Sequence, residues 1–529
     1  MKKFLLSFLS IAILSQSALA WEEDPFLNDA VTTENHNIYG YDIQTNCNGM
    51  TYVFYQTSSQ NGITMRLQVL DRDGKKTLGD DGVVVSDEPN LSYTSVNQLL
   101  YVDREGNALL PVSDCRAGNR QQLYTIYKVN ERGETLWSTT LNKGEVNGSL
   151  ANMQVVQVSD GGYVFAYFRY GTDSDGKSIY YVTLEKLSEE GESEWISHVF
   201  EEGNMISYPY LVDAEEGRVM LVYAVGASYH LTAQLINADG TAGWDEPLTF
   251  YTGGFSPIRA IQTAINVKQA PGGGALVAWM HVAGTYESQL VWIKNDRSFA
   301  FDTEDGSVLL SNTASQSRYL PNMLYNEDDG NIYLVYRQFD QSHQENQGIF
   351  MQKVSQKGKL LWGDGGKPVV DVQSESQYNF PSIQRADHGH VAVFYQSLDG
   401  HADSGPVGSY ITTFDAEGNR ILAPQNFSTN DETKTSLATT PLLDGDHYLA
   451  WWAVRPTSSR LQIKMQYVGT NGSTSTGISN HEENTTAKLL REDCFDVSGR
   501  AIHTPAKGIS LLRRVYENGQ QKIEKHLKR

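Results

Sequence analysis

The chain has 529 residues, of which 40% are hydrophobic and 20% charged, a composition typical of a globular protein with an ample core. Its formal net charge is −21, and because an acidic surface repels phosphate backbones we expect no nucleic-acid partner. Tyrosine, with 29 residues, and glycine, with 46, are both frequent, which is typical of aromatic strands separated by glycine turns.

The first twenty residues have the pattern of a secretory signal peptide. Lys2 and Lys3 precede an apolar stretch over residues 4–14, and residues 18–20 read Ala-Leu-Ala, a small-residue cleavage site. We therefore expect an exported protein whose mature chain begins at Trp21. No later stretch approaches 18 consecutive apolar residues, so we predict no membrane span.

Between residues 21 and 470, a glycine followed by a short apolar strand recurs eight times. Successive repeat glycines are 55 to 59 residues apart, and they are Gly49, Gly106, Gly162, Gly217, Gly273, Gly330, Gly389 and Gly445. Each unit has a weaker strand before the glycine, and a third strand and a D/N-x-x-G type of turn after it. Four antiparallel strands per unit predict an all-β fold with a single eight-bladed β-propeller, and seven blades plus a divergent unit is the alternative.

The fourth strand of a unit often opens with tryptophan, as at Trp137, Trp195, Trp244 and Trp362. The last unit ends near Tyr467 without a clear fourth strand. Residues 24–33 precede the first unit, and we expect them to supply that strand and close the ring. No stretch has a sustained helical period, so helices should be rare.

The chain has three cysteines: Cys47, Cys115 and Cys494. In the repeat, Cys47 falls at a turn between first and second strands, whereas Cys115 falls in a loop between second and third strands. These positions lie on opposite faces of a propeller, so we expect no disulfide between them. No metal-ligand spacing is present, and we predict neither a metal site nor a cofactor.

An aromatic residue stands six positions after most repeat glycines: Tyr55, Phe168, Tyr223, Trp279, Tyr336, Tyr395 and Trp451, with Val112 as the exception. One interpretation is that these residues pack between blades, and the other is that some border one face and stack on a ligand. We expect the pair Trp451-Trp452 to be the one that is not wholly buried, since adjacent strand residues point to opposite faces. The ligand-binding candidates are Trp279, Tyr336, Arg337, Trp451 and Trp452.

Residues 471–488 are polar and read as a linker, and residues 489–529 form a basic tail. The tail carries Asp496, Gly499 and Arg500, and then Lys507 and Gly508 at the start of an apolar strand. It resembles the C-terminal sorting domain of the type IX (Por) secretion system of Bacteroidetes-type bacteria, although it is shorter. The resemblance implies the secretion machinery as a partner, and delivery to the cell surface or release outside the cell. If the tail is only a hairpin appendage, the periplasm is the alternative.

The sequence contains no identifiable catalytic constellation. We expect a monomeric recognition module that binds a glycan, peptide or protein. A glycan-active hydrolase or lyase is the alternative, because 63 acidic residues leave room for a pair of catalytic carboxylates. A structural component of the cell envelope is a third hypothesis.

Overall fold

The chain divides into two compact units, Met1–Thr474 and Ser475–Arg529. The computed structural model describes residues 21–22, 24–33, 37–59, 62–87, 100–114, 123–142, 149–172, 176–200, 206–253, 265–282, 284–311, 315–398, 407–430, 432–454, 461–474, 489–496, 501–502, 508–516 and 521–528. The signal-peptide residues 1–20, Cys115 and the linker residues 475–488 lie outside the described residues, so the predictions made for them stay predictions.

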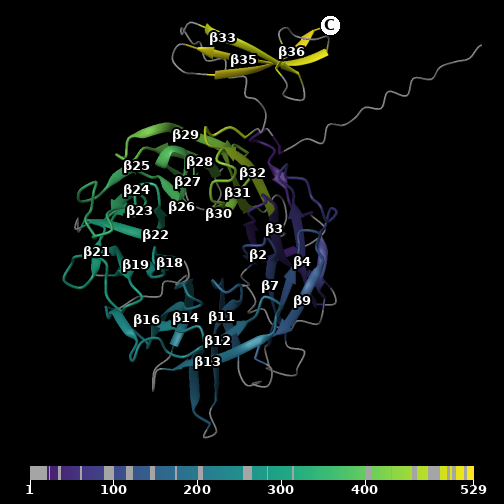
Figure 1. Ribbon diagram of the computed structural model, residues 1–529. Helices are drawn as coiled ribbons and strands as arrows, with labels where there is room; N and C mark the ends of the chain where they lie inside the picture. The colour runs from purple at the N-terminus through teal and green to yellow at the C-terminus, as the bar shows by residue number, and fades with distance from the viewer. Residues whose placement is uncertain are drawn as a thin grey trace, which may run out of the picture. The chain divides into compact units, whose positions relative to one another are not determined.

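The first unit is an eight-bladed β-propeller, as the repeat predicted (Figure 1). Each blade is a four-stranded antiparallel sheet. The strands of blades 1 to 4 are β2 (Asn37–Thr45), β3 (Thr51–Ser59), β4 (Gly62–Leu70) and β5 (Val83–Ser86); β6 (Tyr101–Val102), β7 (Ala108–Asp114), β8 (Leu123–Val129) and β9 (Thr135–Thr140); β10 (Ser149–Gln157), β11 (Tyr163–Thr172), β12 (Ser178–Leu187) and β13 (Ser193–Phe200); β14 (Ile206–Asp213), β15 (Val219–Val225), β16 (His230–Ile236) and β17 (Leu248–Tyr251).

Blades 5 to 8 repeat the same order. Their strands are β18 (Ile265–Gln269), β19 (Ala275–Val282), β20 (Tyr286–Ile293) and β21 (Ser307–Leu309); β22 (Gln316–Asn326), β23 (Asn331–Asp340), β24 (Gln347–Val354) and β25 (Lys367–Gln373); β26 (Gln377–Arg385), β27 (Val391–Leu398), β28 (Val407–Phe414) and β29 (Arg420–Ser428); β30 (Lys434–Thr439), β31 (His447–Val454), β32 (Gln462–Gly469) and β1 (Asp29–Ala30). Among the described residues the single helical element is a 3₁₀ turn, Asp387–Gly389.

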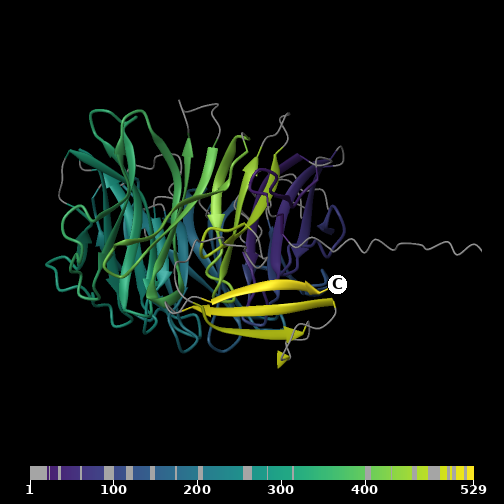
Figure 2. The same ribbon diagram turned by 90° about the horizontal axis from the view of Figure 1, so that it is seen from above.

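The first strand of each blade lies nearest the axis of the ring, and the fourth lies outermost (Figure 1). The strands run between two faces of the ring (Figure 2). Because they are antiparallel, the turns after the first and third strands share one face, which we call the turn face. The loops after the second strands and the connections between blades share the other, which we call the loop face.

The ring closes as the sequence predicted, with strands from both ends of the unit in one sheet. Strand β1 pairs with β32, so that Asp29 lies opposite Met465 and Ala30 opposite Lys464. Asn28 reinforces this join, because its side chain donates to Gln466 Oε1 (2.6 Å) and accepts from Asn430 Nδ2 (2.9 Å). The N-terminal segment therefore completes blade 8.

Tryptophans from the fourth-strand region fasten blades 8, 2, 3 and 4 to the next blade on the turn face. The indole Nε1 atoms of Trp21, Trp137, Trp195 and Trp244 donate, in that order, to the carbonyls of Arg72, Glu189, Ala238 and Asn295 at 2.7–2.9 Å. Each acceptor is the second residue of the turn that follows the third strand of the next blade. In the first three, the ring lies only 2.6–2.7 Å from where a Cβ on that turn's glycine would be, and the glycine has a positive φ. A side chain at these turn glycines would therefore be disfavoured both by the positive φ and by a clash with the indole ring.

The aromatic positions after the repeat glycines are buried between blades, with two corrections of register. In blade 3 the turn closes on Gly161, not Gly162, and in blade 8 it closes on Asp446, so Tyr167 and Trp452 replace Phe168 and Trp451 in the series. Tyr55, Tyr167, Tyr223, Trp279, Tyr336, Tyr395 and Trp452 each pack in a core shared with the preceding blade.

The second unit forms its own four-stranded antiparallel sheet. Its strands, in the order in which they pair, are β34 (Ala501–Ile502), β33 (Leu489–Asp496), β35 (Gly508–Tyr516) and β36 (Gln521–Lys528). Asp496 ends β33 and Gly508 begins β35, whereas Gly499, Arg500 and Lys507 lie outside the described residues. Among the described residues, no helix is long and apolar enough to cross a membrane.

Candidate functional site

The structure places four of the five predicted ligand-binding residues inside the blade interfaces. Trp279, Tyr336 and Trp452 are fully buried, and Trp451 is 8% exposed. The expectation that Trp451 and Trp452 are not both buried was wrong. The two side chains do point to opposite faces of their sheet, but in a closed ring a neighbouring blade covers each face. Arg337 is the exception, since it is half-buried at the loop-face end of β23.

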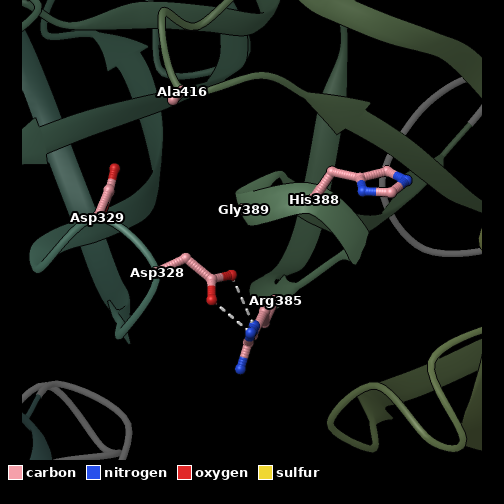
Figure 3. A pocket seen from close by; sticks show the side chains of 6 residues that line it. All are labelled: Asp328, Asp329, Arg385, His388, Gly389 and Ala416. Atoms are coloured by element: carbon pink, nitrogen blue, oxygen red, sulfur yellow. Dashed lines mark hydrogen bonds and ion pairs between the residues drawn. The ribbon is translucent and has the colours of Figure 1, made fainter.

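A pocket of about 360 Å³ lies on the turn face between blades 6 and 7 (Figure 3). It is lined by Asp328, Asp329, Arg385, His388, Gly389 and Ala416. Arg385 binds both carboxylate oxygens of Asp328, at 2.5 and 3.0 Å. Asp329 accepts from Tyr333 (2.6 Å) and pairs with the Lys353 ammonium (2.8 Å). The charges of this pocket neutralise one another, so it offers little to a charged ligand.

A larger set of chemically suitable side chains lies at the loop-face ends of blades 4, 5 and 6. Six half-buried tyrosines pack against the core around Trp279. The sixth, Tyr210, lies in the middle of β14, and we call the five nearer the loop face the tyrosine belt: Tyr208, Tyr229, Tyr251, Tyr286 and Tyr319. The ring centroids of Tyr208 and Tyr229 are 6.1 Å apart, and those of Tyr286 and Tyr319 are 5.4 Å apart. Half-buried tyrosines present a ring and a hydroxyl together, as binding surfaces for polar ligands do.

A histidine and a glutamate lie beside the belt. The His281 ring is 5.3 Å from that of Tyr251, and His281 Nε2 is 3.5 Å from Glu287 Oε2, longer than a hydrogen bond. Burial lowers the pKa of His281, so the imidazole is neutral at pH 7, although Glu287 opposes this shift. Burial, reinforced by Glu287, raises the pKa of Tyr251 to about 12.

Arg337 continues the belt toward blade 7. It lies opposite Tyr319 in the pairing of β22 with β23, with the guanidinium carbon 4.8 Å from the centre of the Tyr319 ring. Its Nη1 donates to the Tyr378 carbonyl at 3.0 Å and to Asn379 Oδ1 at 2.9 Å. Burial lowers the pKa of Arg337, which reflects a partly dehydrated guanidinium.

Irregularities of the inner strands place aromatic residues at the loop face. Both β14 and β26 change register just before a proline, at Ser207/Tyr210 and Asn379/Ser382. The residues concerned, Tyr208 and Phe380, have φ angles of 53° and 50°, a conformation that bulky residues rarely adopt. Bulges of this kind re-aim side chains and cluster at functional sites.

The inner strands carry one acid with a strongly shifted pKa, Asp42 on β2. Burial raises its pKa to about 7, although the backbone N–H groups of Leu100 and Ile43 bind its two oxygens at 2.9 and 2.8 Å. The bond from Leu100 fixes the inner edge of blade 2 to blade 1. Glycoside hydrolysis needs two carboxylates, and no second carboxylate interacts with Asp42 among the described residues.

This shift gives an expected pH dependence. Because the folded pKa of Asp42 exceeds the ordinary 3.8, the folded protein is more stable when Asp42 is protonated. This contribution to the free energy of unfolding is fully present below about pH 4 and is lost as the pH rises through 7. The variant Asp42→Asn should therefore gain roughly 4 kcal/mol in free energy of unfolding relative to the wild type between pH 4 and pH 8, because the pKa is raised from 3.8 to about 7. Urea unfolding of both proteins at the two pH values measures this difference. An equal gap at both values contradicts the assignment to Asp42.

The tyrosine belt could not be recognised from the sequence. Its members stand at strand ends in three blades, so no local spacing links them, and the high tyrosine content was the one available signal. Among the described residues, no group of three or more His, Cys, Asp or Glu side chains is arranged to hold a metal ion.

No family model matches the chain, and no curated protein matches it either. Similar solved structures include a protein of unknown function from Dyadobacter fermentans, with 12% identity, 84% of this chain and 98% of that one covered, and a TM-score of 0.36. The β-propeller domain of the Trilobed protease from Pyrococcus furiosus has 8% identity, with 73% and 98% covered and a TM-score of 0.37. A PL25 ulvan lyase, a polysaccharide lyase, has 10% identity, with 86% and 98% covered and a TM-score of 0.40. At these values none of the likenesses indicates what this chain does.

Proposed function

We propose that the chain is an exported recognition module that binds a saccharide through the tyrosine belt on the loop face. The observation that carries the proposal is the gathering of five half-buried tyrosines over three adjacent blades. Sugar rings offer C–H faces that stack on aromatic rings, and hydroxyls that bond to tyrosine hydroxyls and to nearby polar groups. Export rests on the predicted signal peptide, and surface delivery rests on the sorting-like tail.

The test is binding of the purified protein to an array of mucin and plant saccharides. Tyr229→Ala and Tyr286→Ala each remove one ring from the belt, and each should weaken binding at least about tenfold, as loss of a central aromatic contact does. Tyr325→Ala is the matched control, because Tyr325 is also half-buried but lies at the turn-face end of β22.

The results separate the remaining functions. Belt variants that bind as tightly as the wild type overturn the assignment of the site. A blank array with folded protein overturns saccharide binding and favours a peptide or protein ligand. The hydrolase or lyase alternative has some support in His281 and Glu287 beside Tyr251, and it shows itself as progressive loss of the printed saccharide.

A further inference from the structure

The guanidinium of Arg337 has N–H donors that make no hydrogen bond to the described residues. Its two bonds, to the Tyr378 carbonyl and Asn379 Oδ1, use both N–H groups of Nη1. The N–H groups on Nε and Nη2 meet no acceptor among the described residues, and these atoms are not among the buried polar atoms that lack a partner. They therefore face solvent on the side away from Asn379.

Arg337 also lacks a counter-ion within the described part of the chain. Arg104, Arg218 and Arg385 each pair with a carboxylate at 2.5–3.1 Å, whereas no described carboxylate lies within 4.0 Å of Arg337. Its position over the Tyr319 ring removes water from one face of the guanidinium. A cation that is partly dehydrated and unpaired gains when an anion approaches its free edge.

We infer that Arg337 and Asn379 form a subsite for a single carboxylate group on the saccharide that the tyrosine belt binds, and this inference rests on the proposed function. The free N–H groups on Nε and Nη2 lie in one plane and match the two oxygens of a carboxylate. Tyr319 and the Asn379 side chain hold that plane in place. The Asn379 amide nitrogen can also donate to the bound group.

Phe380 supplies an apolar neighbour for the sugar ring that carries the carboxylate. It follows Asn379 directly, is 42% exposed, and is held in a left-handed conformation with a φ of 50°. A bulky aromatic residue in that conformation is strained, and here it stands beside the unpaired guanidinium. The expected ligand unit is therefore a uronic acid.

The overall charge of the protein limits which acidic saccharides this subsite can bind. At −21, the chain repels a densely charged polyanion at long range. A mainly neutral saccharide with a single carboxylate is repelled much less than a polyanion, and its carboxylate can still pair with Arg337. Saccharides with isolated uronic acids fit better than uniformly acidic or sulfated chains.

The test uses matched pairs of oligosaccharides on the array, each printed as the free uronate and as its methyl ester. The wild-type protein should bind the free acid at least tenfold more tightly in one or more pairs. Arg337→Gln should remove that preference by weakening binding of the acid at least tenfold, while binding of the ester changes less than twofold. Asn379→Ala keeps the charge but frees the guanidinium, and should reduce the preference in part.

Arg385→Gln is the control, because Arg385 lies on the turn face and pairs with Asp328. Thermal unfolding of every variant shows whether it is folded. A preference for the acid that persists in Arg337→Gln, or a wild type that prefers the ester, overturns the inference and leaves the proposed function standing. A blank for every pair overturns the proposed function, and the inference fails with it.

Discussion

The variant Trp21→Ala is expected to lower the free energy of unfolding of the propeller by about 3–5 kcal/mol, as for a large buried aromatic residue. Trp21 is 1% exposed, and its Nε1 donates to the Arg72 carbonyl at 2.9 Å. It is also the residue with which the predicted mature chain begins. Its loss removes a contact by which the N-terminal segment, which completes blade 8, is fastened to blade 1.

Trp137→Ala is the matched control for this experiment. Trp137 makes the same bond, to the Glu189 carbonyl at 2.9 Å, but it is only half-buried and lies within the chain rather than at its end. Trp137→Ala should lower the free energy of unfolding by less than Trp21→Ala does, and it should leave the hydrogen exchange of β1 unchanged. Denaturant unfolding and hydrogen exchange measure the two effects. A loss below about 1 kcal/mol for Trp21→Ala is incompatible with a closing role.

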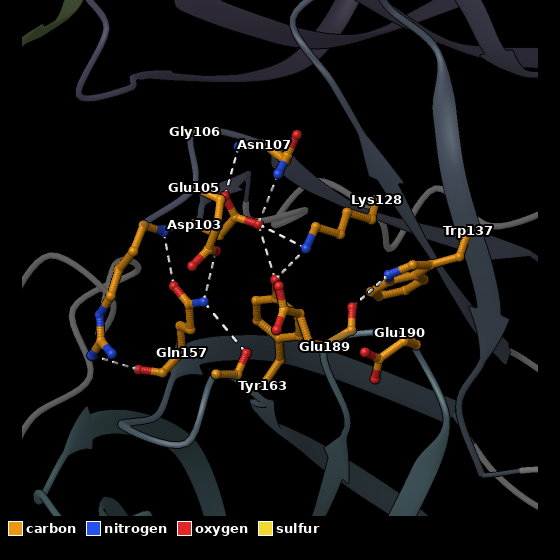
Figure 4. Close-up of polar contacts among 12 residues, drawn as sticks. Asp103, Glu105, Gly106, Asn107, Lys128, Trp137, Gln157, Tyr163, Glu189 and Glu190 are labelled. Carbon is orange, nitrogen blue, oxygen red and sulfur yellow. Dashed lines mark hydrogen bonds and ion pairs between the residues drawn. The ribbon is translucent and has the colours of Figure 1, made fainter.

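The second large effect concerns the buried ion pair of Asp103 and Lys128, which lies within blade 2 at its interface with blade 3 (Figure 4). Lys128 Nζ lies 3.1 Å from Asp103 Oδ2, and the two side chains are 5% and 0% exposed. Tyr163 of blade 3 bonds to both, at 2.7 Å from Lys128 Nζ and 2.9 Å from Asp103 Oδ2. Asp103→Asn and Lys128→Met should each cost about 3–5 kcal/mol, since each leaves a charge or donor buried without its partner.

The double variant Asp103→Asn/Lys128→Met should cost clearly less than the sum of the two, because it leaves no buried charge. Urea unfolding of the four proteins at pH 7 gives the coupling energy. Arg385→Gln with Asp328→Asn provides the comparison, because that pair is 48% and 34% exposed and should couple by less than about 1 kcal/mol. Additive losses at Asp103 and Lys128 contradict a functioning buried pair.

The ring could be predicted from the sequence because each blade carries the same local signals. Eight glycine turns at near-constant spacing determine the number of sheets, and the unmatched last unit with residues 24–33 determines where the ring closes. The register within a blade was less secure. Gly161 and Gly162 are adjacent, and sequence alone does not say which of them closes the turn, so Phe168 was placed where Tyr167 packs.

The proposed binding surface could not be predicted in the same way. The repeat predicted ligand-binding aromatic residues in the middle of second strands. Those positions are buried, because neighbouring blades cover every sheet of the ring on both faces. Tyr229 and Tyr251 belong to blade 4, whereas Tyr286 belongs to blade 5 and Tyr319 to blade 6, so the belt forms only when these blades pack together. Arg337 was named in advance, but its setting between Tyr319 and Asn379 depends on the pairing of two blades.

The loop face of blades 4 to 6 is the proposed binding surface for the ligand. The most direct measurement is hydroxyl-radical footprinting by mass spectrometry, with and without the tightest saccharide from the array. We expect Tyr208, Tyr229 and Tyr286 to be protected by the saccharide, while Tyr325 on the turn face reacts equally in both samples. Protection at Tyr325 with none at the belt would place the ligand on the other face and contradict binding at the tyrosine belt.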